Sequence, residues 1–226
     1  MDAVILACSS LNSHVDAAQE KMGTAYPVIY VDRKYHEDPK QMRQHIMDEL
    51  KYLPSEADTV LVAMGFCGGS WKAVSFEKRI VIPRVDDCIT LLLHTDDTWH
   101  ADLKKKGHLY LRDTDTEEYS LEAMQRKLCR QYGGMYGSMI FNSMFTNYTN
   151  VDMIDTGVYD CYSEEYVIQA QRNADLIRGV LDYVAGSNLI LEKLVSGQWD
   201  QQFIVAEPGQ VLSEKDFWEE RSQNYF

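Results

Sequence analysis

The sequence of 226 residues lacks any apolar run near the roughly 20 residues that a helix needs to cross a membrane. Its opening segment, MDAVILACSS, has no basic stretch and an apolar run of only about six residues, too short for a secretion signal. These absences exclude the usual membrane span and signal peptide. We therefore expect a cytoplasmic protein that contacts no membrane.

Positive charge is also scarce. The chain has 22 Lys and Arg residues against 35 Asp and Glu residues, a formal net charge of −13. Its one basic run is Lys104, Lys105 and Lys106. Binding to a nucleic-acid backbone needs clusters of Lys and Arg that displace counterions. We therefore expect no nucleic-acid partner, and we interpret most of the negative charge as solvated surface.

The familiar local motifs for metals and phosphates are missing. There is no CxxC pair and no HExxH, and GFCGGSWK lacks the spacing of a P-loop. The five cysteines are an odd number in a chain without a secretion signal, which argues against a disulfide framework. Reduced thiols are left, either buried as small apolar groups or used in chemistry.

What the sequence does have is a series of short apolar runs, typical of strands that are covered on both faces. Helical patterns lie between the first three, with Gly23 placed to end one helix and Pro39 in the first turn of the next. This alternation predicts an α/β fold: a Rossmann-like, mostly parallel sheet flanked by helices. The runs are AVILAC (3–8), PVIYVD (27–32), DTVLVAMG (58–65) and RIVIPR (79–84).

The rest of the chain is less regular. We expect a helix over 86–105 that begins at Asp86 or Asp87, because a carboxylate there accepts hydrogen bonds from unpaired amides. Without an internal repeat or a clear linker, the sequence predicts a single α/β domain over residues 1–226. The further elements we expect are strands at 107–114, 150–157 and 201–210 and helices at 117–134, 136–150, 164–184 and 189–199.

Three cysteines and a histidine follow the four apolar runs. Cys8 ends the first, His36 follows the second, Cys67 follows the third and Cys88 follows the fourth. In an open α/β sheet the carboxyl ends of parallel strands share one edge, where ligands bind. Thiolates and imidazole are the usual ligands of zinc, and three thiolates could equally hold an iron-sulfur cluster. The sequence therefore predicts a metal site at Cys8, Cys67, Cys88 and His36.

Glycines surround the second of these cysteines. Gly65, Gly68 and Gly69 would let the backbone approach closely and turn with positive φ, and their amides could donate to a cofactor. The alternative is that the cysteines are buried small residues that happen to end strands. His36, likewise, could simply cap a turn.

Charged residues near Cys88 are candidates for catalysis. Asp86 and Asp87 could orient a histidine ligand or transfer a proton. Arg84 could anchor a substrate carboxylate or phosphate, or pair internally with one of these aspartates. Both alternatives stay open at the level of sequence.

Several of these segments together resemble one protein family. MGFCGG followed by VIPRVDDCITLLL, with ACSSL, YHEDP, NYTNVDMIDTG and a late PGQ, resembles DUF1638, a family of unknown function, over most of the chain. Many members are expected to have HDC where this chain has Asp87 before Cys88, which leaves His36 as the nitrogen ligand. The resemblance implies an association with corrinoid-dependent methyltransferase systems.

Three functions are compatible with these features. The first is a metal-dependent enzyme or accessory factor in corrinoid-linked methyl transfer, acting on a small molecule or a corrinoid protein. The second is a non-catalytic carrier of a metal or cofactor for a partner methyltransferase. The third is a metal-free enzyme with Cys67 as nucleophile. A homo-oligomer is compatible with all three.

Overall fold

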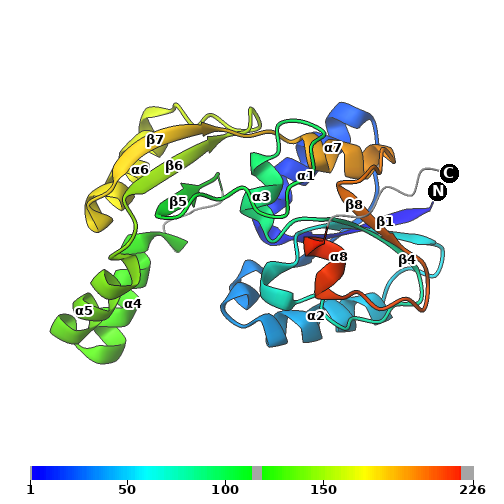
Figure 1. The fold of residues 1–226 in the computed structure, drawn as a ribbon, viewed down its shortest axis with the longest axis horizontal. Helices are drawn as coiled ribbons and strands as arrows, with labels where there is room; N and C mark the ends of the chain where they lie inside the picture. The colour runs from blue at the N-terminus through cyan, green and yellow to red at the C-terminus, as the bar shows by residue number, and fades with distance from the viewer. Residues whose placement is uncertain (1, 114–118, 220–226) are drawn as a thin grey trace. The chain divides into compact units, whose positions relative to one another are not determined.

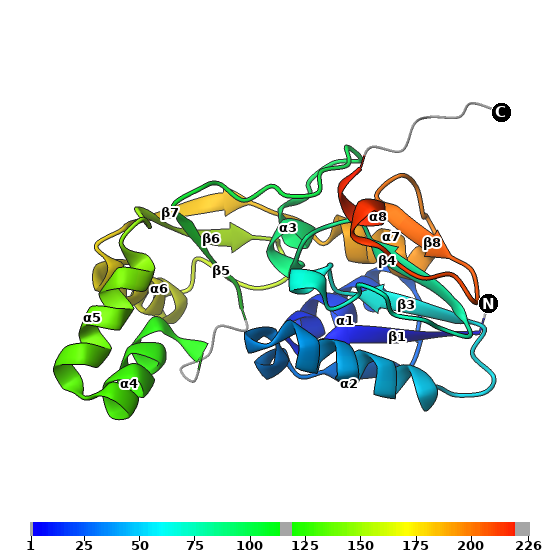
Figure 2. The same ribbon diagram turned by 60° about the horizontal axis from the view of Figure 1, so that its bottom comes forward.

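The computed structural model describes residues 2–113 and 119–219. These residues form two compact units (Figure 1; Figure 2). The first unit lies within 1–103 and 188–226, and the second is the intervening 104–187. The expectation of a single domain over 1–226 concerns independent folding, which this division does not test.

The first unit contains a five-stranded sheet in the order β2-β1-β3-β4-β8. The first four strands are parallel and β8 is antiparallel to β4, so the sheet is mostly parallel, as the sequence predicts. The elements are β1 (Ala3–Cys8), α1 (Asn12–Met22), β2 (Val28–Val31), α2 (Pro39–Lys51), β3 (Thr59–Ala63), β4 (Arg79–Pro83), α3 (Cys88–Leu93), α7 (Leu189–Ser196), β8 (Phe203–Ala206) and α8 (Glu214–Trp218), with short 3-10 turns η1 (Ser9–Leu11), η2 (Arg33–Glu37) and η3 (Cys67–Gly69).

Helices cover both faces of this sheet. In Figure 1, α1 and α7 lie on one side and α2 on the other. Every residue of β1 and β3 is buried, which is the consequence of two covered faces and explains their continuous apolar runs. Met42 and Ile46 of α2 pack with Trp71 and alternate residues of the strands to form the core on the α2 side.

The strand order creates a switch point. From β1 the chain moves to one neighbour, β2, and then crosses back to the other neighbour, β3. At such a reversal the loops after the two central strands diverge, and a crevice opens outside their carboxyl ends. Cys8 is the last residue of β1, and Cys67 lies four residues beyond the end of β3.

Local signals in the sequence account for the helix ends. Asp38 accepts hydrogen bonds from the amides of Lys40 and Gln41 and starts α2, with Pro39 as its first residue. Gly23 ends α1 in the left-handed conformation at φ 67°. Asp87 caps α3, which confirms the prediction of a carboxylate at that start.

The second unit contains a parallel three-stranded sheet in the order β5-β6-β7. Val151 and Met153 of β6 pack with Ala170 and Ala174 of α6 and with the fully buried Phe141 of α5. The elements are β5 (His108–Leu111), α4 (Leu121–Tyr132), α5 (Gly134–Phe145), β6 (Asn150–Asp155), α6 (Glu164–Ile177) and β7 (Val180–Ala185).

Two expected helices are wrong in extent. The helix expected over 86–105 is only α3, because the side chain of Asp96 accepts the Thr98 amide and holds a turn instead. The helix expected over 164–184 ends at Ile177, where Arg178 takes the left-handed conformation at φ 58°. The following residues pair with β6 as strand β7.

Within the described part of the chain, every helix is too short or too polar to cross a bilayer.

Candidate functional site

Cys8 lies at the carboxyl edge of the first sheet, on β1, the strand between β2 and β3. Its side chain is fully buried. The Cys8 Sγ lies 3.0 Å from the Ser10 Oγ and 3.4 Å from the Nε2 of His36, which extends from the η2 turn after β2. The structure therefore brings together two of the predicted ligands, 28 residues apart in the chain.

These neighbours change the acidity of Cys8. Burial raises the pKa of the thiol, but the hydrogen bond and charge of His36 and the hydrogen bonds of Ser10 outweigh burial. The result is a pKa lowered from 9.0 to about 7. An imidazole beside a thiol favours the thiolate, which is the form that binds metals and attacks electrophiles.

Cys67 is in a tightly folded turn. Its own φ is 47°, an uncommon value for a residue with a side chain, and Gly68 and Gly69 follow at 66° and 96°. The Cys67 amide donates to the Asp86 carbonyl at 2.6 Å. A Cβ on Gly65 would lie 2.7 Å from the backbone of Asp87, so glycine is required where the two loops pack.

The glycines thus do what the sequence predicts for the backbone, with close approach at Gly65 and positive φ at Gly68 and Gly69. Their role toward a cofactor stays a prediction. A non-glycine residue in a sparsely populated backbone region costs about 1–3 kcal/mol and is most common at functional sites. The conformation of Cys67 is therefore a reason to look for function in this turn.

Cys88 and Cys67 are electrostatic neighbours. Cys88 is the first residue of α3 and is 4% exposed, and Cys67 is 7% exposed. Burial raises the pKa of Cys67 well above its usual value, and the negative fields of Cys88, Cys8 and Asp87 raise it further. Cys67 thus lies within electrostatic reach of both other cysteines.

The described residues contain no group of three or more His, Cys, Asp or Glu side chains already arranged around a common ion position. The donor set is nevertheless the one zinc prefers, with three sulfurs and an imidazole. None of the three cysteines is in a disulfide. An ion would have to draw the sulfurs of Cys67 and Cys88 toward the Cys8–His36 pair.

A family model matches residues 30–195, and its description is a protein of unknown function, DUF1638. The chain belongs to the DUF1638 family. The match includes His36, Cys67 and Cys88, whereas Cys8 lies before it. No curated protein and no solved structure matches the chain.

In this DUF1638 chain, a cleft of about 420 Å³ opens beside the glycine turn. Asp86 and Asp87 line it together with two cations, Arg43 and Lys72. The Arg43 guanidinium also donates to the Gly69 carbonyl at 2.7 Å, so it ties α2 to the turn. A small molecule in this cleft would meet charges of both signs.

Arg84 and Asp87 have structural contacts. Arg84 is 2% exposed and donates to the backbone carbonyls of Gln201, Asp216 and Glu219 at 2.6–3.0 Å, and it stacks on the Trp99 ring. The Asp87 carboxylate accepts hydrogen bonds from the amides at the start of α3. A catalytic role for either residue, or for Asp86, stays a prediction.

Two contributors to the site are missing from the residues singled out by sequence. Ser10 is fully buried and touches Cys8, and the only signal for it is its place two residues later in ACSS. Phe217 of α8 is fully buried, with its ring 4.7 Å from that of Phe66, next to Cys67. No local pattern relates these two rings, because they are about 150 residues apart in the sequence.

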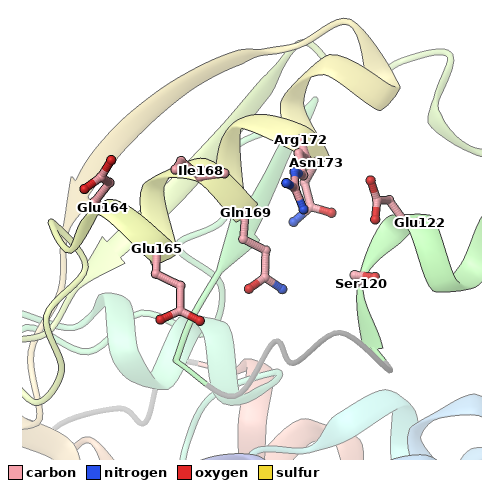
Figure 3. A pocket seen from close by; sticks show the side chains of 8 residues that line it. All are labelled: Ser120, Glu122, Glu164, Glu165, Ile168, Gln169, Arg172 and Asn173. Atoms are coloured by element: carbon pink, nitrogen blue, oxygen red, sulfur yellow. The ribbon is translucent and has the colours of Figure 1, made fainter.

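A hollow of about 780 Å³ lies in the second unit, between α4 and α6 (Figure 3). Glu122, Glu164 and Glu165 are in the first turns of these helices, where negative charge stabilises the helix dipole. The Leu121 amide donates to Asn173 at 3.2 Å across the hollow. The stability of the two helices explains both the glutamates and this hydrogen bond. We therefore place the candidate chemistry at the cysteines and not in this hollow.

Proposed function

We propose that this chain binds a zinc ion or an iron-sulfur cluster through Cys8, Cys67, Cys88 and His36, as an enzyme or accessory factor in corrinoid-linked methyl transfer. The observation that carries the proposal is the position of Cys8. It ends the strand at the switch point of the sheet, contacts His36, and lies within electrostatic reach of Cys67. The corrinoid context comes only from the family resemblance.

The charges of the cysteines favour a cation. Burial is the main cause of the raised pKa of Cys67, and ionised Cys88 and Cys8 oppose its ionisation further. A bound cation removes this opposition, because a coordinating thiol is deprotonated outright. Metal binding would therefore release a proton from Cys67, whose pKa is raised.

The protein's own residues would position the ligands and admit a substrate. Ser10 and His36 hold Cys8 in place, and the packed loops at Gly65 fix the position of Cys67. The cleft beside the turn would admit a small substrate near Arg43 and Lys72. When bound, zinc would act as a Lewis acid on a thiol, and an iron-sulfur cluster would supply electrons for corrinoid activation.

Metal analysis of protein purified without oxygen tests the proposal. We expect about one zinc ion per chain, or the absorbance of an iron-sulfur cluster. Cys8→Ser, Cys67→Ser and Cys88→Ser should each lose the metal, and Cys129→Ser and Cys161→Ser, in the second unit, should keep it. If the metal content is unchanged by all three substitutions at the site, the assignment of ligands is wrong.

A second assay separates an enzyme from a carrier. The metal-loaded protein is incubated with a methyl donor and a corrinoid protein, and the methylated corrinoid is followed by its absorbance. Turnover that disappears in Cys67→Ser supports an enzyme. Stoichiometric transfer of metal to a partner without turnover supports a carrier.

One observation favours a metal-free alternative. The thiol of Cys8, with its pKa of about 7 beside His36, is suited to nucleophilic attack, whereas the raised pKa of Cys67 disfavours the nucleophile expected from the sequence. Under this alternative, metal-free protein has one cysteine that alkylates rapidly. Mass spectrometry of the peptides should identify it as Cys8, and His36→Phe should slow the reaction.

A further inference from the structure

The cleft beside the glycine turn is lined by charges of both signs. Arg43 and Lys72 supply the positive charges, and the negative charges come from Asp86, Asp87 and Glu214. Lys72 and Glu214 lie 3.8 Å apart, and both side chains are more than half exposed. Arg43 is therefore the cation whose partner has to be accounted for.

Arg43 has no acidic partner among the described residues. Its Nη2 donates to the Gly69 carbonyl at 2.7 Å, and its Nε is buried with no acceptor in that part of the chain. No described carboxylate forms an ion pair with the guanidinium, although Asp86 and Asp87 line the same cleft. A guanidinium has five N–H donors in a rigid fork that fits a carboxylate. The protein thus holds opposite charges around one cleft without pairing them with each other.

The two aspartates of the cleft differ in what they contact. The Asp87 carboxylate accepts hydrogen bonds from the amides of Ile89 and Thr90, so it serves as the cap of α3. Asp86 is partly buried and lies on the loop between β4 and α3. Of the two carboxylates, we therefore assign to Asp86 the contact with a bound cationic group.

We infer that the cleft binds a zwitterion, namely an α-amino acid whose carboxylate meets Arg43 and whose ammonium group meets Asp86. A ligand that carries both charges a few bonds apart is complementary to opposite charges that line one cleft but do not pair. A simple anion would pair with Arg43 but would also face the carboxylates, and a simple cation would face the guanidinium. This inference rests on the proposed function, because it names the substrate class of the cleft described there.

The rest of the lining favours an apolar side chain on the amino acid. Phe66 and Trp218 both line the cleft, and Trp218 is 40% exposed. Small-molecule sites combine apolar and aromatic walls with a few polar groups, and the volume of about 420 Å³ is within their usual range. L-Phenylalanine is therefore a suitable probe.

Calorimetric titration of the metal-free protein with three probes tests the inference. L-Phenylalanine carries both charges, 3-phenylpropionate lacks the ammonium group, and 2-phenylethylamine lacks the carboxylate. We expect L-phenylalanine to bind with a Kd below about 1 mM, and about tenfold more tightly than either analogue. A wild type that binds none of the probes overturns the inference, and so does one that binds either analogue as tightly as L-phenylalanine.

Two substitutions test the assignment of the charges. Arg43→Gln should weaken the binding of L-phenylalanine about tenfold and leave that of 2-phenylethylamine unchanged. Asp86→Asn should also weaken the binding of L-phenylalanine, but not that of 3-phenylpropionate. The matched control Arg79→Gln, at the start of β4 where Arg79 pairs with Glu207, should bind all three probes as the wild type does. Circular dichroism verifies that each variant is folded. A folded Arg43→Gln protein that weakens all three probes equally, or none, contradicts the assignment.

Metal analysis of the same variants separates this inference from the proposed function. Arg43→Gln and Asp86→Asn should keep the metal content of the wild type, because neither residue is a proposed ligand. If no metal is bound but the three probes behave as expected, only the assignment of the metal fails. If metal is bound but L-phenylalanine has no advantage over its analogues, only the assignment of the substrate class fails.

Discussion

Cys8 and Cys161 make an informative comparison between the two units. Cys8 is the last residue of a strand in one sheet, Cys161 follows a strand of the other sheet, and both are fully buried. For each thiol burial raises the pKa. At Cys8 the neighbouring His36 and Ser10 reverse the effect, whereas at Cys161 the carboxylates of Asp155 and Asp160 add to it.

This difference teaches that a cysteine at the end of a strand is not a site by itself. What decides is the sign of the charge that the next loop brings to the sulfur. The loop after β2 brings an imidazole to Cys8, and the end of β6 brings a carboxylate to Cys161. The following predictions test this contrast between the two sheet edges.

The largest effect is expected for glycines at the two edges. In Gly65→Ala the new methyl group would meet the Asp87 backbone at 2.7 Å, so we expect a loss of about 2–3 kcal/mol in the free energy of unfolding. Gly157→Ala, after β6, has nothing within 4 Å but keeps φ at 71°, and should lose only about 1 kcal/mol. Urea unfolding followed by circular dichroism measures both. Equal losses would show that the loops after β3 and β4 are not packed as described.

The next effect concerns His36. In metal-free protein, His36→Phe should raise the pKa of Cys8 from about 7 toward or above 9.0. Burial would still raise this pKa, whereas the imidazole that lowers it would be gone. The thiolate absorbance, taken as the difference from Cys8→Ser, measures this change during a pH titration.

The same change affects stability. A thiol whose pKa is lowered on folding stabilises the protein fully above its unfolded pKa, near 9.0, and this stabilisation is lost as the pH falls through about 7. The advantage of wild type over His36→Phe should therefore grow from pH 7 to pH 9. An advantage that is constant over this interval would contradict the assigned contact.

A smaller effect on stability is expected from the different backbone conformations of Cys67 and Cys161. Cys67→Gly should be about 1 kcal/mol more stable than Cys67→Ala, because the position has φ 47°. Cys161 is not among the described residues with positive φ, so Cys161→Gly should be the less stable of its pair by about 0.5–1 kcal/mol. Denaturant midpoints of the four variants give the two signs. If the Gly variant were the more stable, or the less stable, of the pair at both positions, the two backbones would not differ as described.

The smallest effect is spectroscopic. The Tyr162 hydroxyl donates to Asp155 at 2.7 Å, and this bond raises the pKa of Tyr162 to about 12. The contribution of this bond to the free energy of unfolding is complete below pH 10.0, the usual pKa of tyrosine. It is lost as the pH rises through about 12. In Asp155→Asn the ionisation should move back toward 10.0, as measured by tyrosinate absorbance. An unchanged titration would show that Asp155 does not face this loop.

The sequence predicts the first sheet well because its strands are buried on both faces. Continuous apolar runs as short as AVILAC are typical of such strands, and Asp87, Gly23 and Pro39 give the helix ends. The sequence predicts helix where β7 forms, because the pattern of α6 continues into this strand. The boundary between α6 and β7 is set by the left-handed conformation of Arg178 and by the pairing of β7 with β6.

The candidate site is predictable in part. That strand-end residues share an edge follows from the parallel sheet, but which of them touch depends on the strand order, which places β1 between β2 and β3. The contact of His36 with Cys8, and the packing of Phe217 on Phe66, depend on loops and on a distant helix. No local pattern contains that information.

The position of β8 has a consequence for how the chain is made. This strand covers the edge of β4, yet it follows the whole second unit in the sequence. On the ribosome, residues 104–187 therefore emerge while β4 is still an open edge. The buried guanidinium of Arg84 also donates to the carbonyls of Gln201, Asp216 and Glu219, which are translated only after residue 200. Until β8 is translated, the exposed edge of β4 is therefore open to pairing with other chains.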